Sequence, residues 1–167
     1  HGMQGILYAA QTGYNANSRT IINCSWGGEG SSTAEQAVIN TAYNTYGAII
    51  VCAAGNGETD DQGYSTGEYY STFYPGSYSN TISVCPVDCS GNWGGWATYH
   101  ETIDIAAPGE NIYSTTINGT YDTNDGSSMA SPNAASAIGL LRFYYPEFDN
   151  IQLRSRIEET ADDFIYD

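Results

Sequence analysis

Helical and strand patterns alternate along the chain, and this alternation limits the possible folds more than any other feature. Apolar residues recur at helical spacing from Met3 to Ala10, and Gly13 is a plausible end for that helix. The β-branched, apolar run from Thr20 to Cys24 follows, which is typical of a buried parallel strand. Because strands that alternate with helices form parallel βαβ units, the sequence predicts an α/β fold built on a parallel β-sheet.

The same alternation continues through the rest of the chain. We expect a helix that begins at Ser32 or Thr33 and runs through Tyr46, strands at 48–53, 81–84 and 103–105, a hairpin-like segment at 111–121, and a helix from Ser128 through Tyr145. Asp149 is expected to cap a last helix, with Gln152 as its reciprocal partner. Residues 55–80 form a predicted long loop, and loops of that length are usually functional. No repeat or linker interrupts this pattern, so one compact piece is predicted.

The chain carries a large excess of negative charge. It has 19 acidic against 4 basic residues, a net charge of −15. Repulsion from phosphate groups argues against nucleic acid and against anionic membrane surfaces as partners. No apolar stretch approaches the roughly 20 residues needed to cross a bilayer, and no basic-then-apolar leader is visible. We favour solubility in a secreted or saline setting as the meaning of this charge, over specific capture of a basic ligand.

The four cysteines do not form a metal-binding pattern. Cys24 and Cys52 lie inside apolar runs, where a free cysteine behaves as a small hydrophobic residue. Cys85 and Cys89 lie close together, but no histidine or second close pair completes a zinc-like set. We therefore expect no metal at these residues, and the sequence leaves their disulfide state open.

Ser128 lies where a helix is expected to begin. Gly126 permits a close backbone approach just before it, and a serine hydroxyl here lies beside unpaired backbone N–H groups and the positive end of the helix dipole. Such a position stabilises an oxyanion that forms next to a nucleophile. Taken alone, however, a serine at a helix N-terminus is more often a cap than a nucleophile.

The motif around Ser128 has a counterpart in a known family. The run Gly126-Ser127-Ser128-Met129-Ala130-Ser131-Pro132 resembles the nucleophile motif of the subtilases, a family of serine proteases, which is usually Gly-Thr-Ser-Met-Ala-Xaa-Pro. Further blocks match that family in the same order: 21–28 (IINCSWGG), 51–57 (VCAAGNG), 74–75 (YP) with 81–84 (TISV), and 104–109 (DIAAPG). The resemblance implies a subtilisin-like three-layer fold, with helices on both faces of the parallel sheet. Residues 1–167 would then be a single partial catalytic domain, the C-terminal portion, with the N-terminal part missing.

The resemblance assigns chemical roles to two residues. Ser128 would attack the scissile carbonyl of a protein or peptide substrate and form an acyl-enzyme, which is the chemistry of a serine endopeptidase. Asn56 would donate its side-chain N–H to the oxyanion, beside the backbone N–H of Ser128. The alternative for Asn56 is a turn residue between two glycines.

The resemblance also implies two walls that hold an extended substrate. Their residues are Ser25, Trp26 and Gly27 on one side and Ala53, Ala54 and Gly55 on the other. Trp26 would cover a more distant subsite, and its alternative is a core residue. Phe73 would narrow the first specificity pocket. The bond between Tyr74 and Pro75 is expected to be cis by resemblance.

A serine hydrolase of this type also needs a base and a carboxylate that orients the base. The family supplies them in Asp-Xaa-Gly and His-Gly-Thr-His blocks before the serine, and neither block occurs here. Of the two histidines, His1 is expected to begin the first helix and His100 to be an exposed loop residue. We therefore expect this chain alone to be inactive.

The triad Asp and His would come from a missing N-terminal half of the same domain, or from the second chain of a split protease. The remaining alternative is a non-catalytic peptide-binding module. By resemblance the protein is expected to be secreted or extracellular. Calcium is possible by the same resemblance, but no ligand residue is assigned and no other cofactor is expected.

Overall fold

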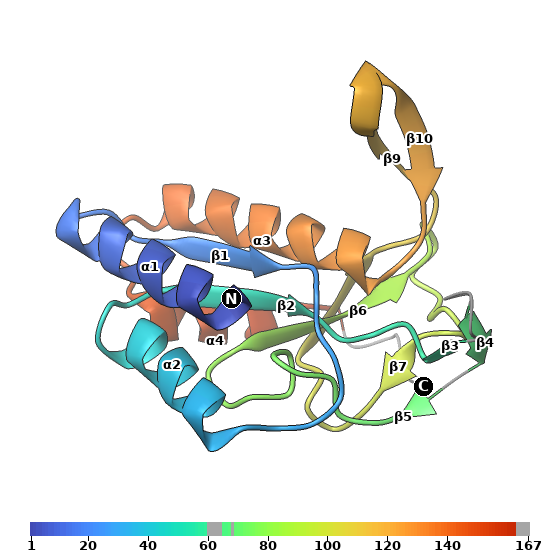
Figure 1. Ribbon diagram of the computed structural model, residues 1–167. Helices are drawn as coiled ribbons and strands as arrows, with labels where there is room; N and C mark the ends of the chain where they lie inside the picture. Colours follow the sequence, from blue (N-terminus) through green and yellow to red (C-terminus); the bar gives the residue numbers. More distant parts are fainter. Residues whose placement is uncertain (60–64, 68, 163–167) are drawn as a thin grey trace.

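The structure, a computed structural model, describes residues 1–59, 65–67 and 69–162. Its centre is a sheet of four parallel strands in the order β1-β2-β6-β8 (Figure 1). The strands are β1 (Ile21–Cys24), β2 (Ile49–Ala53), β6 (Ile82–Val87) and β8 (Ile105–Pro108). β2 and β6 are buried along their whole length, which explains their continuous apolar runs. The predicted α/β fold with a parallel sheet is confirmed.

Helices cover both faces of this sheet, so the predicted three layers are confirmed. The helices are α1 (Gly2–Asn15), α2 (Thr33–Asn44), α3 (Ser127–Tyr144) and α4 (Asn150–Glu159). Successive strand residues point to opposite faces, so Ile50 packs with Ile39 of α2 while its neighbour Ile49 packs with Ile138 of α3. Figure 1 shows α1 in front of the sheet and α4 behind it.

Shorter elements lie beyond the carboxyl ends of the central strands. They are β3 (Glu58–Thr59), β4 (Ser65–Gly67), β5 (Tyr69–Tyr70) and β7 (Thr98–Tyr99). The predicted hairpin is confirmed as β9 (Ile112–Thr115) and β10 (Tyr121–Asn124), joined through the short helix η1 (Ile117–Gly119), and it projects from the body of the molecule (Figure 1). The predicted loop at 55–80 therefore contains β3, β4 and β5, while its residues 60–64 and 68 lie outside the described part of the chain.

The first helix ends later than predicted. α1 continues past Gly13 to Asn15. A Cβ added at Gly13 would collide with the side chain of Thr20, so this glycine serves close packing against the next segment and not termination. The last helix begins as predicted, because the Asp149 carboxylate accepts the Gln152 N–H at 2.8 Å and the Gln152 side chain accepts the Asp149 N–H at 3.0 Å.

The strand expected at 103–105 was misplaced. The Ile103 N–H instead closes a turn on the carbonyl of His100 at 3.0 Å, and β8 begins at Ile105, where its pairing with Val84 begins. β6 likewise continues to Val87, beyond the predicted end at 84. Both differences arise because the length of a parallel strand depends on its neighbours in the sheet, which a local pattern does not contain.

The described chain leaves β1 as an edge strand of the parallel sheet. Its neighbour β2 pairs with it in register from Ile21↔Ile49 to Cys24↔Cys52. Purely parallel sheets normally have their strands covered, and an open edge presents unpaired backbone N–H and C=O groups. The edge of β1 is therefore a place where a further strand could add.

Candidate active site

Ser128 lies in the first turn of α3, at the end of the molecule where the parallel strands finish (Figure 1). Gly126 precedes the helix with φ 147°, a backbone conformation that favours glycine. The Ser128 Oγ donates to the carbonyl of Ser25 at 3.4 Å, and the Ser25 Oγ donates to the carbonyl of Ser128 at 2.8 Å. The nucleophile predicted from the motif therefore meets the first residue of the predicted substrate wall.

The side chain of Asn56 is oriented by the residue just before Ser128. The Asn56 Oδ1 accepts hydrogen bonds from the Ser127 N–H at 2.9 Å and from the Ser127 Oγ at 2.8 Å. The Nδ2 atom therefore lies on the other side of the carboxamide, 3.4 Å from where a Cβ on Gly126 would be. This arrangement presents an N–H donor beside the start of α3, where the backbone N–H groups also point outward.

Ser127 also ties the second wall to the helix. Its Oγ accepts the N–H of Gly55 at 3.1 Å, and Ser127 is almost fully buried, with 1% of its surface exposed. Further along the helix, the Ser131 Oγ donates to the Asn23 Oδ1 at 2.7 Å. The start of α3 is thus held by residues from the ends of both β1 and β2. The contact of Ser127 with Asn56 was not predicted from the sequence, where its only signal was a hydroxyl next to Ser128.

The two predicted walls face each other across the ring of Phe73. A Cβ on Gly27 would collide with this ring, and a Cβ on Gly55 would lie 3.2 Å from its Cγ. Ala53 and Ala54 continue the second wall and are buried. The structure therefore brings Phe73 between the walls. A side chain would collide with the ring at Gly27 and would crowd it at Gly55.

Trp26 lies apart from this slot. It is 43% exposed, so the alternative of a core residue is wrong. A Cβ on Gly2 would lie 2.5 Å from the Trp26 ring, which places the indole against the beginning of α1. An indole at the edge of the wall can contact a substrate residue distant from the scissile bond.

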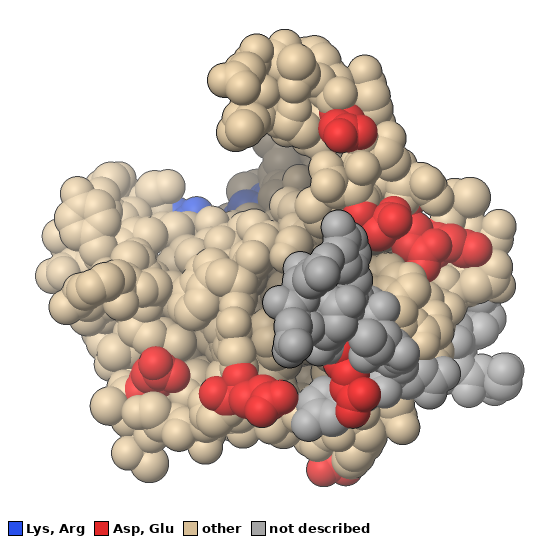
Figure 2. All heavy atoms as spheres, turned by 45° about the vertical axis from the view of Figure 1, so that its right-hand side comes forward, with Lys and Arg blue, Asp and Glu red and all other residues tan. Residues whose placement is uncertain are grey.

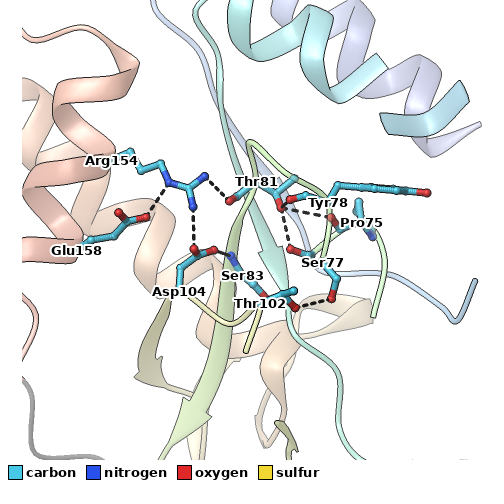
Figure 3. Close-up of polar contacts among 10 residues, drawn as sticks. Pro75, Ser77, Tyr78, Thr81, Ser83, Thr102, Asp104, Arg154 and Glu158 are labelled. Carbon is cyan, nitrogen blue, oxygen red and sulfur yellow. Dashed lines mark hydrogen bonds and ion pairs between the residues drawn. The ribbon is translucent and has the colours of Figure 1, made fainter. Parts of the chain in front are cut away.

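Hydrogen bonds anchor the loop that carries Phe73 to the rest of the fold. The Phe73 N–H donates to the Ser77 Oγ at 3.0 Å, and the Thr102 Oγ1 donates to the same oxygen at 2.8 Å. The Thr81 Oγ1 lies 2.7 Å from the carbonyls of Gly76 and Tyr78 (Figure 3 draws the bond to Tyr78). The bond between Tyr74 and Pro75 within this loop is cis, as predicted.

An ion pair continues this network into α4 (Figure 3). The Arg154 guanidinium donates to the Thr81 carbonyl, to the Asp104 carboxylate and to the Glu158 carboxylate, each at 2.7 Å. Burial raises the pKa of Asp104, while the Ser83 N–H and Arg154 act against that rise. The loop beside the site is therefore fixed by contacts with the opposite face of the sheet.

The histidines do not complete a triad within the described residues. The His100 Nδ1 contacts the Oγ1 and the N–H of Thr102, at 3.1 and 3.2 Å, and its ring packs against Tyr70. His100 is half-buried, so the expectation of an exposed residue was wrong. His1 precedes α1, as predicted. In the described part of the chain, no histidine is hydrogen-bonded to the Ser128 Oγ.

The cysteines and acidic groups offer no metal centre in the described ranges. Cys24, Cys52 and Cys85 are buried and Cys89 is exposed, all as free thiols. Burial raises the pKa of the Cys52 thiol well above its usual value, so it stays protonated. No group of three or more His, Cys, Asp or Glu side chains that could hold a metal ion occurs among the described residues. Across the same residues, no helix has the length and apolar character needed to span a bilayer.

Comparison with known proteins matches the sequence of this chain to a family. The profile of the Subtilase family matches residues 1–166. Subtilisin DY of Bacillus licheniformis is 34% identical over 168 residues, covering 98% of this chain and 57% of that protein. The thermostable alkaline protease of Halalkalibacterium halodurans is 40% identical over 159 residues, covering 95% of this chain and 39% of that protein.

Solved structures agree with the family match. Sphericase superposes with a TM-score of 0.80 at 30% identity, over 95% of this chain and 54% of its own. The chain belongs to the subtilase family of serine peptidases. The chain spans between 36% and 57% of the length of the curated relatives that it matches, which is about half of such a protein or less.

Proposed function

We propose that this chain is the nucleophile-bearing part of a serine endopeptidase, in which Ser128 forms the acyl-enzyme and Asn56 stabilises the oxyanion. The observation that carries this proposal is the fixed carboxamide of Asn56, whose oxygen is occupied by two hydrogen bonds from Ser127. The opposite N–H edge then stands beside the first turn of α3 and can stabilise charge that develops on a carbonyl attacked by Ser128. A cap alone would not require such a donor.

The base that activates Ser128 would come from the remainder of the catalytic domain. Relatives of this chain are longer, and β1 leaves an open parallel edge at the strand that ends beside Ser25. A strand that adds to this edge would end near Ser128, where a histidine could accept its proton and an aspartate could orient that histidine. The 167 residues alone are therefore expected to hydrolyse no peptide, because they lack the proton acceptor.

Labelling of the complete protein tests the proposal. A fluorophosphonate probe should modify Ser128 and stop peptide hydrolysis, and Ser128→Ala should abolish both labelling and turnover. Ser155→Ala, in α4, where the half-buried hydroxyl bonds to Glu159 within the same helix, serves as the matched control and should leave both intact. A complete protein that neither labels nor hydrolyses peptides would contradict the proposal.

A non-catalytic peptide-binding module is the second candidate, because the walls and the slot are present in this chain. It predicts micromolar peptide binding that Ser128→Ala leaves unchanged, with no labelling by the probe. In either case, Phe73 should limit the size of the side chain that enters the slot. Phe73→Gly should raise the preference for bulky aromatic residues over alanine at the first subsite, and an unchanged preference would show that Phe73 does not narrow the pocket.

A further inference from the structure

We propose that the cavity beside Asn56 accepts an arginine or lysine side chain of the substrate, immediately before the scissile bond, and that Glu29 selects it. This inference rests on the proposed function, because it names the substrate class of the same site. The first observation is the composition of the cavity. It has a volume of about 250 Å³ and is bounded by Gly28, Glu29, Asn56, Thr72, Phe73 and Thr98, among others. Glu29 is the one charged residue among the described residues that line it.

Backbone contacts fix the place of Glu29 relative to the aromatic floor. The Gly28 N–H donates to the Tyr74 carbonyl, and the Tyr74 N–H donates to the Gly28 carbonyl, both at 2.9 Å. Glu29 is the residue after Gly28, and Gly28 pairs with Tyr74, which is the residue after Phe73. Glu29 and Phe73 therefore occupy facing positions on the two antiparallel segments that this bridge joins.

No cation of the described chain neutralises Glu29. All 4 basic residues of the chain are arginines, and each contacts another part of the fold. Arg19 and Arg142 donate to the carbonyl of Phe148, Arg154 donates to Thr81 and Asp104, and Arg156 lies over the ring of Tyr145. These partners lie where the central strands begin or between α3 and α4, at the end of the sheet away from Ser128.

The face that carries the site is correspondingly acidic. Figure 2 turns the carboxyl ends of the central strands toward the viewer and shows acidic groups spread over this face, with basic groups visible only in a recess at the back. The net charge of −15 adds a negative potential that concentrates cations near such a surface. The net charge alone favours solubility as its meaning, whereas Glu29 places one of these negative charges at a cavity.

The shape of the slot suits a long basic side chain better than a bulky ring. Phe73 already occupies the space between Gly27 and Gly55, so a second ring would compete with it. An unbranched aliphatic stem can lie along the phenyl face, and its cationic head gains from the ring and from a carboxylate at the rim. Arginine would additionally donate two parallel hydrogen bonds to the Glu29 carboxylate.

The test uses the complete protein and peptide substrates that differ only at the residue before the scissile bond. Arginine and citrulline form the key pair, because citrulline has nearly the same shape and no charge. We expect kcat/KM to be about tenfold higher or more for arginine, as for a hydrogen bond to a charged group. Glu29→Gln should reduce this ratio to about one, and Glu29→Arg should favour glutamate instead. Asp122→Asn, on the exposed hairpin, changes the net charge by the same amount as Glu29→Gln and should leave the ratio unchanged.

The outcomes separate this inference from the proposed function. Hydrolysis that depends on Ser128 but does not distinguish arginine from citrulline would overturn the inference and leave the proposed function standing. A ratio that survives Glu29→Gln, or that falls equally in Asp122→Asn, would also overturn the role of Glu29. Absence of any hydrolysis or labelling would overturn both.

Discussion

The two ends of α3 differ sharply in their surroundings. At its N-terminal end, Ser127 and Ser131 are buried and bonded to residues at the ends of β1 and β2. At its C-terminal end, Leu140, Phe143 and Tyr144 are 73%, 86% and 75% exposed. Large apolar residues that cluster on a surface usually mark a contact with another segment or protein. The N-terminal end of α3, which carries Ser128, is therefore tied into the fold, whereas its C-terminal end presents large apolar side chains at the surface of the described chain.

The largest effect is expected at the packed end. Asn56→Leu removes the donor that we propose faces the oxyanion, and should lower kcat of the complete protein by roughly 10²–10³, about 2.7–4 kcal/mol, with little change in KM. That magnitude is the one known for the corresponding loss in a subtilisin. Asn44→Leu, at the exposed end of α2, is the control. A fall in kcat of less than threefold for Asn56→Leu would contradict the proposed oxyanion role of Asn56 and weaken the contrast between the two ends of α3.

The exposed end supplies the next prediction. If the remainder of the catalytic domain covers Phe143, then Phe143→Ala should lower the free energy of unfolding of the complete protein by about 3 kcal/mol, because it leaves a cavity. Urea denaturation measures the change. Ile117→Ala, at the tip of the hairpin and 84% exposed, should change it by less than about 0.5 kcal/mol. Equally small changes in the free energy of unfolding for the two variants would mean that the C-terminal end of α3 stays exposed to solvent in the complete protein.

Ser127 offers a smaller effect at the packed end. Ser127→Ala removes the hydroxyl that bridges Asn56 and Gly55, and should cost about 1–3 kcal/mol of stability because a buried N–H loses its partner. We also expect kcat to fall about tenfold, since the carboxamide loses one of its two anchors. Ser127→Thr keeps the hydroxyl and should restore both quantities. Loss of stability without loss of kcat would show that Ser127 does not orient Asn56.

The middle of α3 should be nearly neutral. Ser136 is exposed and its Oγ donates to the Pro132 carbonyl within the helix. Ser136→Ala removes this local bond but gains helix propensity, so the free energy of unfolding should change by no more than about 0.5 kcal/mol. Thermal denaturation of the complete protein checks this value. A large change would mean that Ser136 makes a further contact in the complete protein, so that the middle of α3 would also be packed.

Local sequence signals predicted those features whose causes are local. Asp149 and Gln152 lie three positions apart, and their reciprocal cap follows directly from that spacing. Strand β2 was predicted correctly as buried, because parallel strands covered on both faces are continuously apolar. Strand β1 was predicted as a strand, but only Cys24 in it is fully buried, because β1 lies at the edge of the described sheet. The family resemblance assigned roles to Ser128 and Asn56, and these roles stay predictions. The structure shows that Asn56 is hydrogen-bonded to Ser127, the residue next to Ser128.

Features that depend on distant contacts could not be predicted in this way. β8 begins at Ile105 because of its pairing with β6, and no pattern near Ile103 contains that information. Gly13 serves the packing of Thr20 and not the end of a helix. Glu29 reaches the cavity through the bridge between Gly28 and Tyr74, so a single acidic residue in a glycine-rich loop carried no signal of its own.

The position of Arg154 has a consequence for the order in which the protein is made. The arginine lies 73 positions after Thr81 and 50 after Asp104, yet it bonds both of them and so secures the loop that carries Phe73. During synthesis the ribosome releases Phe73 and Ser128 before it releases this arginine. The loop that carries Phe73 therefore gains this anchor only when nearly all of the described chain has emerged, so the first turn of α3 is synthesised before that loop is fully secured.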